Sequence, residues 1–252
     1  MILSFLSPRN ALDAYKAFVF ERKTLYLYPS DKSQAMKIVN IGDKKSVLSS
    51  YIAEIRDVHI QKDSMRFRAN LERVGAVFAY EISQTLSYSE KQVTTPLGVA
   101  AVQTFDTPLV VAAILRAGLP LQNGILGVFD HADCAFLSTF RKFGKGDYFK
   151  VHADYCTCPP LEDNVLIVAD PVLATGSSME SALAKLEEEG GKALHVHLVC
   201  PVASRYAVDQ LLQKLDDRFT LWVAAIDEEL TSHNYIIPGL GDAGDLAYGG
   251  KR

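Results

Sequence analysis

The sequence has no long hydrophobic run, no secretory signal and no excess of basic residues. Its longest apolar runs, 109–115 and 221–226, are far shorter than the roughly 20 residues that a membrane-spanning helix needs. The amino terminus carries no basic residue ahead of its short apolar stretch, and no long apolar segment follows it. We therefore expect a cytoplasmic protein that does not cross a membrane.

Cysteine and histidine are also sparse and are not grouped as metal ligands usually are. Four cysteines in 252 residues lack the paired spacing of a zinc site or a disulfide framework. His195 and His197 alternate in an apolar run, which predicts two side chains on one face of a strand and provides no third ligand. The pattern predicts no metal site built from protein ligands.

What is present is typical of an ordinary folded protein. Hydrophobic residues make up 48% of the chain and charged residues 22%, which excludes the disordered and low-complexity classes. Twenty-six Lys and Arg stand against thirty Asp and Glu, a net charge of -4, so the chain lacks the basic excess of a nucleic-acid binder. Small-molecule chemistry is favoured.

The chain divides near residue 35. Residues 1–35 are aromatic and polar, are interrupted by Pro8 and Pro29, and match no helix or strand period, so we interpret them as an extension. The 217 residues of 36–252 have the length of one domain. A protein that begins at Met36 is expected to fold.

Helical periodicity is clearest after residue 63. Apolar residues recur there at spacings of three and four up to Leu86, behind the capping residues Asp63 and Ser64, which predicts a helix about twenty residues long. A second helix is predicted after Ser177, which would form a capping box with Glu180. A third is predicted over 206–215.

Five short apolar runs beyond residue 106 predict buried strands: 108–115, 134–140, 164–170, 193–199 and 219–225. Because helices alternate with these strands, we expect an α/β fold, a mainly parallel sheet with helices on both faces. Ligands of such sheets bind at the carboxyl ends of the strands.

The segment after the third of these strands has the features of a phosphate site. Asp170 ends the strand, and a turn through Thr175 and Gly176 leads to Ser177 and Ser178 at the start of the predicted helix. Backbone N–H groups, hydroxyls and the helix dipole at such a turn favour a phosphomonoester. A plain capped turn is the alternative. No Lys follows the glycine, so a P-loop NTPase is poorly supported.

Three stretches together resemble a known family: ILRAGLP at 114–120, DPVLATGSS at 170–178 and NYIIPGLGDAGD at 234–245. On these motifs the chain is similar to the type I phosphoribosyltransferases, and within them to the uracil phosphoribosyltransferases. The resemblance runs from about Met36 to the end. It implies the type I phosphoribosyltransferase fold, with a small base-binding hood and a mobile hairpin, and a salvage enzyme that makes UMP and pyrophosphate from uracil and phosphoribosyl pyrophosphate.

The resemblance also implies the residues of the site. Those expected to bind phosphoribosyl pyrophosphate are Arg116, Arg141, Asp170, Pro171, Val172, Leu173, Ala174, Thr175, Gly176, Ser177, Ser178 and Asp242. Those expected to bind uracil are Ile236, Gly241, Asp242 and Ala243. Catalytic roles are expected for Arg116 and Arg141, which would bind pyrophosphate, and for Asp242, the ionisable group of the base loop. A homo-oligomer and a GTP effector are further properties found in this family.

The chain departs from the family's pattern at three positions. The two acidic residues that usually follow Arg141 are absent, and Ser177 replaces a glycine. Pro171 stands where many relatives have a second acidic residue, which leaves Asp170 alone. We therefore expect Mg²⁺ to arrive on the substrate, largely hydrated, without direct ligation by the protein.

The sequence leaves two other interpretations to compare with the enzyme. GLGDAG at 239–244 matches the dinucleotide-binding pattern G-x-G-x-x-G, but only eight residues follow it, too few for the required helix and strand. The alternative to an enzyme is a regulator that keeps the fold to sense uridine nucleotides. The altered Arg141 loop and Ser177 favour that alternative, whereas the net charge and the intact base motif favour the enzyme.

Overall fold

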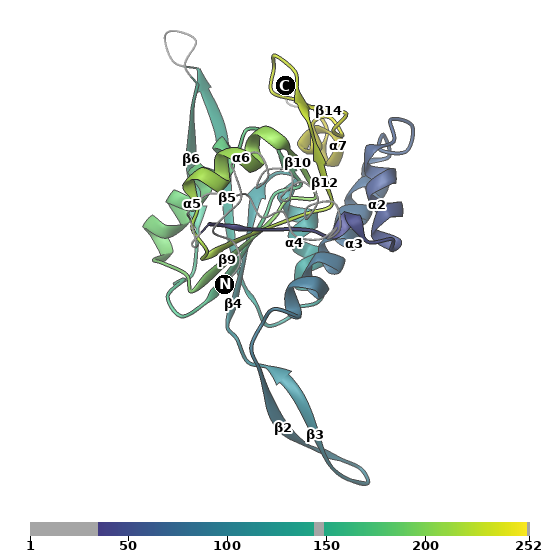
Figure 1. Cartoon of the computed structure of the whole chain (residues 1–252), viewed down its shortest axis with the longest axis vertical. Helices are drawn as coiled ribbons and strands as arrows, with labels where there is room; N and C mark the ends of the chain where they lie inside the picture. The colour runs from purple at the N-terminus through teal and green to yellow at the C-terminus, as the bar shows by residue number, and fades with distance from the viewer. Residues whose placement is uncertain (1–34, 144–148, 251–252) are drawn as a thin grey trace, which may run out of the picture.

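The protein is described here from a computed structural model that covers residues 35–143 and 149–250; the side chains of 139–143 and 149–154 lie outside the description. Its centre is a seven-stranded sheet with the strand order β1-β11-β9-β7-β4-β5-β6 (Figure 1). The strands are β1 (Lys37–Asn40), β11 (Phe219–Val223), β9 (His195–Val199), β7 (Val165–Ala169), β4 (Leu109–Leu115), β5 (Asp133–Phe143) and β6 (Phe149–Thr157). All neighbours run parallel except β5 and β6.

Helices cover both faces of this sheet. One face carries α5 (Ser177–Gly190) and α6 (Arg205–Lys214), and the other carries α2 (Val47–Arg56), α3 (Ser64–Ser83) and α4 (Gly118–Leu126) (Figure 1). Side chains of β4 and β7 are almost completely buried from both faces. Their near-continuous hydrophobicity therefore follows from burial on two sides. Among the described residues, no helix combines the length and hydrophobicity that a membrane span requires.

The five predicted strands and the predicted long helix are confirmed. The helix α3 begins at Ser64, and the side chain of Asp63 accepts hydrogen bonds from the N–H groups of Met65 and Arg66. Its apolar stripe is buried, but Leu86 lies beyond the helix end. The helix predicted over 206–215 is α6, which Ser204 caps by accepting from Ala207 N–H.

The predicted capping box of α5 is wrong. The N-cap is Gly176, with φ of 83°, and no side chain caps the helix. Ser177 is already inside the first turn, and the Glu180 carboxylate pairs instead with Lys214 Nζ at 2.8 Å. Glycine adopts this positive φ without strain, which explains why Gly176 is the N-cap and the helix begins at Ser177.

Two of the helices touch backbone to backbone. A Cβ on Gly124 of α4 would lie 1.8 Å from the carbonyl oxygen of Glu72, and one on Gly75 of α3 would lie 2.3 Å from the carbonyl oxygen of Leu121. No side chain fits between the helices at this crossing. The two glycines therefore let α3 and α4 pack with their backbones in direct contact.

Smaller elements complete the chain. They are the 3₁₀ helix η1 (Ile41–Asp43), the parallel strands β8 (Val172–Leu173), β10 (Val202–Ser204) and β12 (Ala225–Asp227), the antiparallel pair β13 (Glu229–Leu230) and β14 (Ile236–Ile237), and the helix α7 (Ala243–Tyr248). The strands β2 (Tyr88–Thr95) and β3 (Gly98–Phe105) form a hairpin that projects from the body of the molecule (Figure 1). No sequence pattern predicted this hairpin.

Candidate active site

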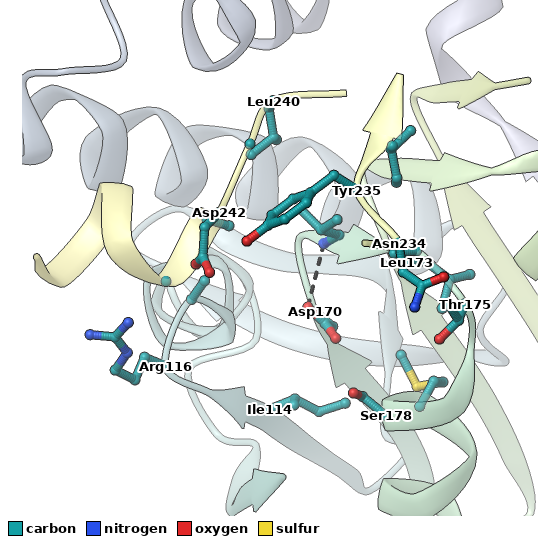
Figure 2. Close-up of a pocket in the computed structure, with 18 of the residues that line it drawn as sticks. Ile114, Arg116, Asp170, Leu173, Thr175, Ser178, Asn234, Tyr235, Leu240 and Asp242 are labelled. Atoms are coloured by element: carbon teal, nitrogen blue, oxygen red, sulfur yellow. Dashed lines mark hydrogen bonds between the residues drawn. The ribbon is translucent and has the colours of Figure 1, made fainter. Parts of the chain in front are cut away.

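A cleft of about 500 Å³ opens at the carboxyl ends of the central strands. The loop after β7 forms its floor, the segment after β4 forms one wall, and β14 with the start of α7 forms the opposite, hood-like side (Figure 2). This is where a parallel sheet is expected to bind its ligand. Two sequence segments about sixty residues apart, 170–179 and 234–244, thus meet across one cavity.

The start of α5 is built to receive an anion. The Thr175 hydroxyl donates to Ser177 Oγ at 3.1 Å and accepts from Ser177 N–H at 3.4 Å. Helix geometry leaves the next N–H groups of the first turn without intrahelical partners, and the helix dipole adds positive potential there. The Ser204 hydroxyl, which donates to Ala174 O, ties the loop to the start of α6. The turn therefore presents fixed donors to the cleft.

Asp170 lies at the floor, directly after β7. Burial raises the pKa of its carboxyl from 3.8 to about 7, and the Val172 N–H, which donates to Oδ1 at 3.4 Å, lowers it in part. Figure 2 shows this carboxylate directed into the cavity, with Ser178 and Tyr235 around it. A buried carboxylate of this kind needs hydrogen-bond donors, and the hydroxyl groups of a ligand would supply them.

Arg116 is the charged group of the wall formed after β4, and it already has partners. Its Nη2 lies 2.6 Å from Asp245 Oδ1, and its Nη1 donates to Gly249 O at 2.9 Å. In Figure 2 its guanidinium is turned away from Asp170. The ion pair is partly exposed, so it holds the side chain weakly, and an anion in the cleft could replace Asp245.

The hood is formed by backbone in unusual conformations. Gly239 and Gly241 have φ of 53° and 91°, and a Cβ on Gly239 would clash with Ile236 O. The Gly239 N–H donates to Asp227 Oδ2 at 2.9 Å, and the same carboxylate binds Arg56. The loop is thereby anchored to β12 and α2, which leaves its inner face to present peptide groups to a ligand.

Asp242 has a structural role in addition to the expected one. It is the N-cap of α7, and its Oδ1 accepts a hydrogen bond from Asp245 N–H at 3.0 Å. It also lines the cleft. Asp245, a second carboxylate of the same motif, was not singled out in the sequence, although it holds Arg116.

Most of the residues expected at the site do line one cavity. The structure brings together Arg116, Asp170, Val172, Leu173, Ala174, Thr175, Gly176, Ser178, Ile236, Gly241, Asp242 and Ala243. Pro171 and the exposed Ser177 belong to the same loop but do not line the cavity. The backbone of Arg141 is in β5, while its side chain and the hairpin tip at 144–148 lie outside the described residues.

Some lining residues were not predicted. Asn234 and Tyr235 contribute side chains from the loop that leads into β14, and Leu240 and Met179 add apolar surface. Asn234 has a positive φ of 63°, which turns the chain into the hood. The first two belong to the motif quoted from the sequence, so a signal was present, but the motif did not distinguish their side chains from those that face outward.

The described residues contain no group of three or more His, Cys, Asp or Glu side chains placed to hold a metal ion. Asp170 is the one carboxylate at the floor, and the rigid ring of Pro171 follows it. This donor set fits a cation carried by a substrate better than one held by the protein.

Comparison with known proteins gives consistent matches. The family model described as uracil phosphoribosyltransferase matches residues 43–250. A uracil phosphoribosyltransferase of Porphyromonas gingivalis is 47% identical over 216 residues, 86% of this chain and 100% of that protein. One from Methanothermobacter thermautotrophicus is 39% identical over 74% of this chain and 85% of its own length. A solved structure of an Aquifex aeolicus protein superposes with a TM-score of 0.75 at 28% identity, covering 84% of this chain and 98% of that chain.

Proposed function

The chain belongs to the uracil phosphoribosyltransferase family and is a glycosyltransferase of pyrimidine salvage, and from this premise we propose how its cleft makes UMP from uracil and phosphoribosyl pyrophosphate. The regulator that was weighed as an alternative is not supported. One observation carries the proposal: an anion-binding helix start and a backbone-lined hood face the same cavity. The first suits a sugar phosphate, and the second suits a flat base.

The sugar end of the site is the floor. The 5′-phosphate binds the N–H groups and hydroxyls between Thr175 and Ser178, and Asp170 accepts hydrogen bonds from the ribose hydroxyls. Those donors favour the charged form of Asp170 and offset the effect of burial on its pKa. The phosphate and hydroxyl contacts together orient the anomeric carbon toward the hood.

The base end of the site is the hood. Peptide groups at Ile236, Gly241 and Ala243 bind the two carbonyl oxygens and the imide N–H of uracil. Asp242, at the start of α7, orients a ribose hydroxyl or a water that receives the proton from the ring nitrogen. The support for this role is that Asp242 lines the cleft and that the α7 cap fixes its carboxylate.

The leaving pyrophosphate is bound by Arg116 and Arg141. For Arg116 this requires an exchange, because its guanidinium is paired with Asp245. The pyrophosphate carries more negative charge than a single carboxylate and displaces it. The bond from the anomeric carbon to pyrophosphate breaks as the bond to the ring nitrogen of uracil forms. Negative charge develops on the leaving pyrophosphate in this step, and the two arginines stabilise it there.

The arginines and the shape of the cleft are the protein's contribution to binding pyrophosphate. Mg²⁺ carried by the substrate would supply further neutralisation of the pyrophosphate charge. The isolated carboxylate of Asp170, followed by Pro171, supports this arrangement because one carboxylate is a poor cage for the ion.

We also propose that the protein is a homo-oligomer through the β2–β3 hairpin. Leu97 is fully exposed, and Val99 and Val102 are 68% and 43% exposed. A two-stranded ribbon is marginally stable by itself, so contact with a second copy would stabilise it. Light scattering of Leu97→Ser with Val99→Ser should show a smaller particle, and an unchanged mass would contradict the interface.

Two further expectations accompany the enzyme. The four cysteines are free thiols, which supports a reducing, cytoplasmic location. GTP, which the family resemblance implies as an effector, stays a prediction that is tested by measuring turnover with and without added GTP.

The deciding experiment is an assay for nucleotide formation with matched bases. Uracil should be converted to UMP, and cytosine should be used less by roughly a thousandfold or more, because its amino group leaves the backbone groups of the hood unpaired. Adenine and a reaction without base serve as controls. Comparable use of cytosine, or activity with adenine alone, would contradict the proposal.

A further inference from the structure

A second cavity, of about 400 Å³, lies at the other end of the sheet. It opens where β7 and β9 begin, at Val165 and His195, and its rim includes residues 85–87 after α3 and Thr107 before β4. The cleft described above lies at the carboxyl ends of the same strands. The two cavities share no lining residue, so the second one is not part of the transferase site.

A row of polar side chains crosses three neighbouring strands at this cavity. Lys37 of β1 is in register with Thr220 of β11, and Thr220 is in register with His197 of β9. The next residues along the same face, among them Val39, Trp222 and Val199, belong to the hydrophobic core. Polar groups are costly at such positions unless they are hydrogen-bonded.

His197 has one ring nitrogen available for a ligand. Its Nδ1 lies 3.0 Å from Trp222 Nε1. An indole N–H can only donate, so Nδ1 accepts and the proton of the neutral imidazole is on Nε2. The side chain is only 4% exposed, and Nε2 has no hydrogen-bond partner within the described part of the chain. Burial also lowers the pKa of this imidazole to about 3, which keeps it neutral. The cavity therefore contains a fixed, unpaired N–H donor.

The charges around His197 favour a ligand whose hydrogen-bond acceptor is negatively charged. The side chain of Lys37 is exposed, and its positive charge lowers the pKa of both His195 and His197. Asp217 lines the cavity too, and its charge raises the pKa of His195, but it is not among the charges that shift the pKa of His197. The His195 Nε2 is already engaged by Thr220 Oγ1 at 3.0 Å.

We propose that this cavity binds a small organic anion, whose carboxylate or phosphate group accepts hydrogen bonds from His197 Nε2 and Lys37 Nζ. Its apolar part lies against Leu86, Val165 and Leu194, which also line the cavity. The site is separate from uracil and phosphoribosyl pyrophosphate binding. A cavity of this volume holds a compact molecule rather than a peptide.

Trp222 is the sole tryptophan of the chain and lines this cavity, so its fluorescence reports on occupancy. The experiment titrates the full chain with benzoate, phenyl phosphate and benzamide, with UMP present at saturation to block the cleft. Benzoate or phenyl phosphate should give a saturable change, with affinity at least about tenfold above that of the uncharged benzamide. Preference for one of the two anions identifies the acceptor as carboxylate or phosphate. No saturable change, or equal affinity for benzamide, would overturn the proposal.

Two variants and a second measurement locate the site. Lys37→Met keeps the apolar stem and should weaken anion binding about tenfold, whereas Lys45→Met, which removes the same charge at an exposed position outside the cavity, should leave it unchanged. Nuclear magnetic resonance of ¹⁵N-labelled histidine should show the His197 Nε2–H signal move on addition of benzoate and not of benzamide. Equal weakening in both variants, or a His197 signal that stays in place, would contradict the assigned contacts.

Discussion

The two ends of the central sheet obtain their polar groups in different ways. At the carboxyl ends, Asp170 and Arg116 follow the last strand residues and belong to loops. At the amino ends, Lys37, Thr220 and His197 lie within the strands themselves. Loop groups can adjust to a substrate that arrives after folding. Of the in-strand groups, Thr220 and His197 are buried as soon as the sheet forms, whereas Lys37 stays exposed. In the second cavity His195 Nε2 and His197 Nδ1 therefore already have partners within the sheet, which leaves His197 Nε2 for a ligand.

The largest expected effect is on the pH dependence of stability, to which Asp170 at one end of the sheet and His197 at the other contribute with opposite sign. The pKa of Asp170 is raised from 3.8 to about 7, so this group stabilises the fold at low pH and the contribution is lost as pH rises through that interval. His197, with its pKa lowered from 6.5 to about 3, does the reverse: its contribution is lost as pH falls below 6.5. Asp170→Asn should gain stability relative to the unchanged protein by about 3 kcal/mol as pH rises from 4 to 7.

Urea denaturation across that pH range checks this prediction. His197→Gln is the matched variant for the other end, and it should gain relative stability as pH falls. Parallel curves for Asp170→Asn and the unchanged protein would mean that the carboxyl is hydrated and titrates normally.

The second effect is on turnover, which should depend on charge at the carboxyl ends of the strands and not on charge at their amino ends. Arg116→Ala should lower turnover by roughly a hundredfold or more, because it removes charge that stabilises the leaving pyrophosphate, with little change in uracil binding. Lys37→Met removes a positive charge at the opposite end and should leave turnover unchanged. Steady-state kinetics of both variants make the comparison. A loss of only a few-fold in Arg116→Ala would assign the guanidinium to its ion pair with Asp245 alone.

A smaller effect is expected at Asp242, where capping and chemistry can be separated. Asn is as good an N-cap as Asp, so Asp242→Asn should keep the melting temperature while turnover falls about tenfold. Asp242→Ala should lose the turnover and, in addition, about 1 kcal/mol of stability. Normal turnover in Asp242→Asn would leave this residue with the structural role alone.

The smallest effect is expected from removing residues 1–35. Met36 is buried and its N–H donates to Leu215 O at 3.2 Å, so a chain that begins there retains the first core contact of β1. Turnover within about twofold of the full chain is expected. The ratio of turnover numbers for equal amounts of folded protein is the measurement, and an insoluble or inactive product would place part of 1–35 within the fold.

Sequence patterns predicted the elements whose burial is periodic or continuous. The strands around 109–115 and 165–169 and the helix behind Asp63 were found because core packing imposes those patterns. The family motifs also located most of the cleft. The capping of α5 was missed because Ser177 and Glu180 match a capping box, whereas the positive φ of Gly176 leaves Ser177 inside the helix.

Contacts between distant residues were not predictable in this way. The Arg116–Asp245 pair joins residues 129 positions apart, and nothing local to either one marks it. The second cavity was missed for the same reason: His195 and His197 were expected on one face of a strand, which their ring contact at 4.7 Å confirms, but Lys37 reaches them only through the pairing of β1 with β11.

The backbone contact of α3 with α4 determines where the cleft can change its width. Gly75 and Gly124 leave no gap through which these helices could slide, and α4 begins two residues after Arg116. The wall that carries Arg116 is therefore the rigid side of the cleft. Any opening that admits uracil or releases UMP has to come from the facing side. There, buried residues of β14 and the short α7 pack against α2 and α3, and Arg68 donates a hydrogen bond to Ala247 O at 2.6 Å.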